Sequence, residues 1–163
     1  MVSLTNAGIA APSAIGAADL ALVVAHLVAT AAMAAILWFV QVVHYPLFAK
    51  VGPDHFVEYE RSNTQRTSLV VGPPMAVEGL TAVLLFVAPP EGVGRAIPFV
   101  SGVLLAVVLL STIAVQVPLH GSLSERFDTA LVTRLVRSNW LRTVGWTARV
   151  VLATVIVWRA VRG

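Results

Sequence analysis

Several side chains capable of chemistry lie inside or beside the long apolar stretches of this sequence, where ionisable groups are costly and rare. His44 and His120 could act as general bases, because an imidazole titrates near neutral pH, and they are candidate metal ligands. Glu78 could orient a base or supply a proton, with its charge balanced by Arg149. Together these residue types predict acid–base chemistry on a bound molecule.

A second set of polar residues could hold the polar part of a substrate. Arg142 and Asn139 could stabilise a developing oxyanion or anchor a polar head group, so they join the candidate catalytic residues. The chain has no cysteine and no His-x-x-x-His or Glu-x-x-His spacing, so no motif identifies a metal or another cofactor. The candidate substrate-binding residues are Gln41, Gln116, Trp146, Arg149 and Arg66.

The composition indicates an integral membrane protein. Of the 163 residues, 58% are hydrophobic and only 12% are charged, against about 25% charged in a typical soluble domain. The net charge of +3 does not indicate nucleic-acid binding, because the basic residues are scattered along the chain rather than clustered in a patch. We therefore expect the lipid bilayer, and no nucleic acid, as a partner.

Four apolar stretches are each close to the ~20 residues that a helix needs to cross a bilayer. They cover residues 20–43, 68–88, 97–117 and 141–161. Because lipid tolerates only helices and closed barrels, we predict an all-α integral membrane four-helix bundle, with one transmembrane domain over residues 1–163. Residues 1–17 have no Lys or Arg before the apolar run, which predicts a poorly ordered leader rather than a cleaved signal peptide.

The basic residues predict the orientation. With four spans, both termini and the loop 89–96 share one side, and the longer loops 45–67 and 119–140 share the other. Seven basic residues on the long-loop side against three on the first predict cytoplasmic long loops and external termini, in the inner (plasma) membrane. The seven are Lys50, Arg61, Arg66, Arg126, Arg134, Arg137 and Arg142, and the three are Arg95, Arg159 and Arg162.

Both long loops contain helical patterns. Pro53-Asp54 is typical of a helix start, and apolar residues recur every four positions over residues 123–135. We therefore predict short interfacial helices in both loops, with Ser138 or Asn139 capping the fourth span.

The polar residues of each span recur at steps of three or four, so they share one inward face. His44 and His120 should lie at the same height, while Glu78 and Arg149 should lie roughly ten residues deeper, near ~15 Å, as natural partners. His26 is 18 residues from His44, about 27 Å along a helix, and cannot share its site. These observations predict a polar cavity near the cytoplasmic face.

Purely structural interpretations stay open. Glu78 and Arg149 could form an ion pair that only fixes how two helices meet, and Gln116 could be a hydrogen-bonding contact between helices. His44 could simply end a helix before Pro46. The segment 72–74, Gly-Pro-Pro, could kink the second helix or could begin it.

Short strings over most of the chain from about residue 20 carry a family resemblance. They are His44-Tyr45-Pro46-Leu47-Phe48, Val71-Gly72-Pro73-Pro74-Met75 with Glu78, Val117-Pro118-Leu119-His120, and Asn139-Trp140-Leu141-Arg142-Thr143 with Trp146. They resemble small bacterial four-span membrane proteins that are loosely anthrone-oxygenase-like. The resemblance implies an oxygenase or related enzyme acting on a lipophilic aromatic or isoprenoid-like molecule. It also implies a histidine near Asn63, and this departure speaks against a three-histidine metal site.

The leading hypothesis is a membrane-embedded enzyme, oxygenase-like or acid–base in its chemistry, acting on a lipophilic small molecule in the polar cavity. One alternative is a small proton-coupled transporter or channel, which would require a homo-oligomer and a freely titrating Glu78. Another is a haem- or quinone-binding bundle that uses His44 and His120. An assembly subunit without chemistry is the remaining possibility.

Overall fold

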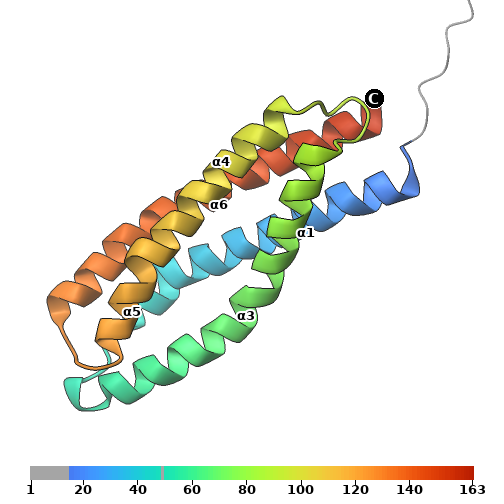
Figure 1. The fold of residues 1–163 in the computed structure, drawn as a ribbon. Helices are drawn as coiled ribbons and strands as arrows, with labels where there is room; N and C mark the ends of the chain where they lie inside the picture. The colour runs from blue at the N-terminus through green and yellow to red at the C-terminus, as the bar shows by residue number, and fades with distance from the viewer. Residues whose placement is uncertain (1–14, 49) are drawn as a thin grey trace, which may run out of the picture.

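The computed structural model describes residues 15–48 and 50–163, and this part of the chain is helical without strands (Figure 1). Four rods are each long and apolar enough to cross a membrane, which confirms the predicted all-α membrane bundle. The first rod is α1 (Ala17–Phe39), η1 (Val40–His44) and α2 (Tyr45–Phe48); the second is α3 (Pro53–Val87). The third is α4 (Ala96–Ser111), η2 (Thr112–Gln116) and α5 (Val117–Leu123); the fourth is α6 (Thr129–Arg162). Most of the predicted leader, residues 1–14, lies outside the described residues.

The rods run up and down between two ends of the bundle. The start of α1 and the C-terminal end of α6 lie at the end that carries the connection 88–95, here called the 88–95 end (Figure 1). The connection between α5 and α6 lies at the opposite, 124–128 end. Helix α1 packs against α3 and α6, and α4 packs against α6. Each helix therefore turns one face to the interior.

The long-loop segments differ from the prediction of separate interfacial helices, because they are the first turns of α3 and α6. Asp128, rather than Ser138 or Asn139, caps the last helix: its carboxylate accepts hydrogen bonds from the backbone amides of Ala130 and Leu131 at 2.8 and 3.2 Å. At ~1.5 Å per residue the 35 residues of α3 extend over about 50 Å, well beyond a ~30 Å hydrocarbon core. The amphipathic turns therefore continue the membrane helices past the apolar layer.

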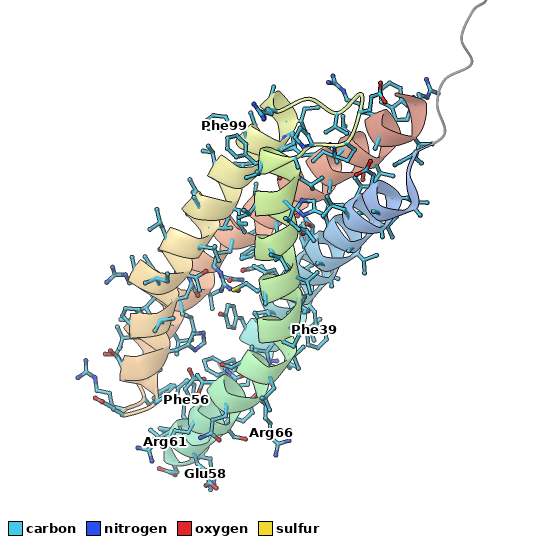
Figure 2. The ribbon with its side chains drawn as sticks, turned by 45° about the vertical axis from the view of Figure 1, so that its right-hand side comes forward. Phe39, Phe56, Glu58, Arg61, Arg66 and Phe99 are labelled. Atoms are coloured by element: carbon cyan, nitrogen blue, oxygen red, sulfur yellow. The ribbon has the colours of Figure 1, made fainter. Side chains whose placement is uncertain are left out.

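Pro73 and Pro74 lie inside α3, so the Gly-Pro-Pro segment does not begin a helix. Proline removes a backbone donor and crowds the preceding turn. Helix α3 bends about midway along its length in both views (Figures 1 and 2). The bend separates a membrane half that carries Glu78 from a half that ends near the 124–128 end.

Two π-helices, η1 and η2, interrupt the first and third rods, and each ends two residues before a proline, Pro46 or Pro118. The amide of Tyr45 bonds to the carbonyl of Val40, and that of Val117 to the carbonyl of Thr112, both five residues back. A proline ring crowds the carbonyl four residues earlier, and one extra residue in the preceding turn relieves that crowding. Such π-turns are frequent at functional sites.

Apolar side chains cover the outside of the bundle, and polar ones are buried inside it. Leu69 is 77% exposed, whereas Glu60, Glu78 and Arg149 are fully buried. This distribution suits a protein surrounded by lipid acyl chains. At the 124–128 end an aromatic and aliphatic cluster joins α2, α3, α5 and α6; its buried members are Tyr45, Phe48, Phe56, Leu119, Leu123, Val132 and Leu135.

Candidate functional site

A cavity of about 400 Å³ lies toward the 124–128 end, where the two π-helices approach α3 and α6. Its volume is within the range of small-molecule sites, ~300–1,000 Å³. Its polar lining includes His44, His120 and Arg142. The other lining residues are Ile36, Leu37, Val40, Tyr45, Asn63, Thr64, Thr67, Ser68, Val71, Thr112, Val117, Gly121 and Ser124.

The wall of the cavity contains a histidine–glutamate pair. Nδ1 of His120 lies 2.5 Å from Oε1 of Glu60, whose side chain is fully buried. The second oxygen of Glu60 accepts a hydrogen bond of 3.0 Å from the amide nitrogen of Asn63. Because both carboxylate oxygens are engaged, Glu60 is held in place and orients the imidazole. With Nδ1 directed at Glu60, Nε2 of His120 is the nitrogen left for a ligand.

His44 lines the same cavity as His120. This agrees with the prediction that the two histidines lie at the same height in the bundle. Its Nε2 atom is buried and has no hydrogen-bond partner in the described structure. Tyr59 stacks on its ring with centroids 6.3 Å apart. A buried ring nitrogen without a partner leaves a hydrogen-bonding capacity for a bound molecule.

Arg142 enters the cavity from α6 and is 8% exposed. Its Nη1 atom donates to Oδ1 of Asn139 at 3.1 Å, and the amide of Asn139 donates to Oε1 of Gln41 at 2.9 Å. These two hydrogen bonds orient the guanidinium of Arg142. The Nε atom of Arg142 is buried and has no hydrogen-bond partner among the described residues. Gln41 and Asn139 therefore position Arg142 and do not line the cavity themselves.

Glu78 and Arg149 form the expected ion pair, with Nη2 of Arg149 2.9 Å from Oε1 of Glu78. The indole nitrogen of Trp146 donates to the other carboxylate oxygen at 2.7 Å, and Arg149 also donates to Ser101 of α4. None of these residues lines the cavity, so the structure does not bring them together with His44 and His120. The reason is depth, because they lie along the helices toward the 88–95 end. This network ties α3, α4 and α6 together.

Two further candidates, Arg66 and Gln116, are also absent from the lining of the cavity. Arg66 is exposed on α3, bonds to Ser62 and points away from the bundle, because it occupies the outer face of that helix (Figure 2). Gln116 is buried and donates to the hydroxyl of Ser138 at 2.8 Å, which joins η2 to α6. His26 lies 2.8 Å from the hydroxyl of Thr81 and is separate from His44, as its spacing requires.

Metal coordination has little support in this geometry. No three histidine or acidic side chains of residues 15–48 and 50–163 are grouped closely enough to hold a metal ion. Asn63 lines the cavity beside Glu60, at the position where the sequence resemblance implies a histidine. An amide there donates to the carboxylate instead of offering a metal ligand.

Sequence reasoning did not include Glu60 or Asn63 among the site residues, because it treated the helix in residues 45–67 as a separate interfacial helix. The buried and cavity-facing residues Phe56, Glu60, Asn63 and Thr67 follow steps of four, three and four, which is one face of a continuous helix. That periodicity is the signal that could have identified them. It places these residues on the inner face only if the helix that begins at Pro53 continues unbroken into the second span.

No protein-family model, no curated protein and no solved structure matches this chain. The anthrone-oxygenase-like resemblance therefore stays an expectation from short sequence strings. The chemistry of the site must be argued from its own residues.

Proposed function

We propose that the protein is a membrane-embedded enzyme that carries out acid–base chemistry on a lipophilic small molecule held in the cavity. The observation that carries this proposal is the contact between His120 and the buried Glu60 at the cavity wall. A carboxylate that accepts the Nδ1 proton of a histidine holds the ring in the tautomer whose Nε2 is free to take a proton. His120 is then the general base, and Glu60 and Asn63 are positioning residues.

The cavity is suited to a substrate that arrives from the lipid. Three of its lining residues, Ser68, Val117 and Gly121, are exposed and lie on α3 and α5. The opening therefore lies between these two helices, on a surface otherwise covered by apolar side chains. The substrate enters laterally from the bilayer, with its apolar part against the aliphatic lining.

The alternative function, proton-coupled transport through Glu78, is disfavoured, because Arg149 and Trp146 occupy both oxygens of the Glu78 carboxylate.

The basic residues favour one orientation of this site. Lys50, Arg61, Arg66 and Arg126 lie near the 124–128 end, whereas Arg95 and Arg159 lie near the other. The positive-inside rule then puts the 124–128 end, and the cavity near it, at the cytoplasmic face of the inner membrane. Both ends of the described chain lie on the outer side in this orientation.

Proton abstraction can be tested without the natural substrate. Nitrobenzisoxazole loses its ring C–H proton to a general base as its N–O bond breaks, and the coloured nitrophenolate product is followed by absorbance. We expect the purified protein in phosphatidylcholine nanodiscs to accelerate this elimination. His120→Gln should lower the rate by about 100-fold, in the range of a general-base contribution, and Glu60→Gln should lower it less.

The matched control is His55→Gln, because His55 is exposed at the start of α3 and lies outside the cavity. Its rate should equal that of the parent. Equal rates for the parent and His120→Gln, or no acceleration over empty nanodiscs, would argue against acid–base catalysis at this site.

A further inference from the structure

The positive charge of Arg142 has no counter-ion in the described part of the protein. Its one hydrogen-bond acceptor there is the neutral amide of Asn139, at 3.1 Å. The ion pairs among the described residues are His120–Glu60 and Arg149–Glu78, and neither includes Arg142. A guanidinium that is 8% exposed and unpaired is expensive to keep, because its lost hydration is not replaced by an anion.

The two fully buried carboxylates are already occupied. Glu60 is held by His120 and Asn63 through its two oxygens, and Glu78 is held by Arg149 and Trp146. Neither is within ion-pair distance of Arg142. Among the described residues, therefore, no buried carboxylate compensates the charge of Arg142, which lies over the ring of Trp146 with its Cζ atom 5.7 Å from the centroid.

The cavity provides a place for a compensating negative charge. The buried Nε of Arg142 and the buried Nε2 of His44 both lack hydrogen-bond partners, and both residues line the cavity. No aspartate or glutamate is among the described residues that line it. The lining also includes hydroxyl and amide side chains such as those of Asn63 and Thr64, and an aliphatic part formed by Ile36, Leu37, Val40, Val71 and Val117.

We propose that the cavity binds an amphiphile with one anionic head group, a carboxylate or a phenolate, which Arg142 and His44 hold by hydrogen bonds. The apolar body of the amphiphile lies along the aliphatic lining and leaves between α3 and α5 toward the acyl chains. Charge-assisted hydrogen bonds to the guanidinium supply the preference for an anion over a neutral polar group. This inference rests on the proposed function for the identity of the cavity as the substrate site, and it names the class of substrate.

The test compares three probes that differ in charge and in chain: dodecanoate, dodecanol and acetate. Binding is measured by titration calorimetry on the full chain in phosphatidylcholine nanodiscs, after subtraction of partitioning into empty nanodiscs. We expect dodecanoate to bind at least about tenfold more tightly than dodecanol, the effect of one charge-assisted hydrogen bond. Acetate should not displace dodecanoate at comparable concentration, because it lacks the apolar body.

Variants of Arg142 and its partner test the assignment of the head-group site. Arg142→Gln should abolish the preference for dodecanoate, and Arg137→Gln, an exposed arginine on the same helix, should leave it unchanged. Asn139→Asp is a second variant that keeps the arginine and places a carboxylate against it, so the preference should again be lost. Equal binding of dodecanoate and dodecanol by the parent, or an unchanged preference in folded Arg142→Gln or Asn139→Asp, overturns the proposal. Displacement of dodecanoate by acetate at comparable concentration would contradict the claim that the ligand needs an apolar body.

This experiment separates the inference from the proposed function. Binding requires no turnover. A preference for dodecanoate without proton abstraction would therefore support the anionic-ligand inference and contradict the proposed enzymatic function. Elimination that depends on His120, without a preference for dodecanoate, would support the proposed function and contradict the anionic-ligand inference.

Discussion

Nδ1 of His120 lies 2.5 Å from Oε1 of Glu60, although the two residues are sixty positions apart in the sequence. One comes from the early turns of α3 and the other from α5, which follows a π-helix. The contact joins the second and third rods beside the cavity. It gives the imidazole a fixed orientation with one nitrogen left for a ligand.

Removal of the Glu60 carboxylate should destabilise the protein. Glu60→Ala leaves Nδ1 of His120 and the amide nitrogen of Asn63 without their acceptor, at a cost of about 1–3 kcal/mol in the free energy of unfolding. Glu60→Gln keeps one acceptor oxygen and should lose less. Chemical unfolding in detergent measures both. Glu58→Ala, an exposed acidic residue on the same helix, is the control, and an equal loss for the two alanine variants would contradict a bonded Glu60.

The Glu78–Arg149 pair should behave as a structural unit. Glu78→Leu leaves the fully buried guanidinium of Arg149 unpaired, and we expect the free energy of unfolding to fall by about 3–5 kcal/mol. Adding Arg149→Met removes the stranded charge and should recover most of that loss, because a buried pair is costly to desolvate. Thermal unfolding of the two single variants and the double variant completes the cycle. Losses that simply add would show that the two residues act independently.

Blocking the opening between α3 and α5 should impair function without unfolding the protein. A side chain at Gly121 meets open space, so Gly121→Leu fits the fold while it occupies the cavity mouth. We expect nitrobenzisoxazole elimination to fall at least about tenfold, because the probe can no longer approach His120 correctly. Gly79→Leu is the matched control, since Gly79 also has open space around it but lies outside the cavity. The same rate in both variants would argue for another entrance.

The orientation can be measured directly, because the chain has no cysteine of its own. Glu125→Cys reports on the 124–128 end and Glu91→Cys on the 88–95 end, and both positions are exposed. A membrane-impermeant maleimide should label Glu91→Cys in intact spheroplasts and Glu125→Cys only after lysis. The opposite pattern would put the cavity near the outer face.

The sequence by itself determined the class of protein, the four helices and the inner face of each one. Charged residues are too few for a soluble surface, and a repeat of three and four residues places polar side chains such as His44 and Arg142 on one stripe. Depth counted along the helices also sufficed to pair Glu78 with Arg149, because both lie within long α-helices rather than in a π-turn or a connection.

The tertiary structure decided which polar residues meet at the cavity. Glu60 contacts His120 because α3 is continuous from Pro53 and bends about midway, so that its first turns lie against α5. Local apolar periodicity predicts neither the continuity of α3 nor its bend. The π-turns before Pro46 and Pro118 add a residue to two rods and alter their registers locally. Helical period assigns a face to each residue, whereas contact between helices depends on their bends, registers and lengths together.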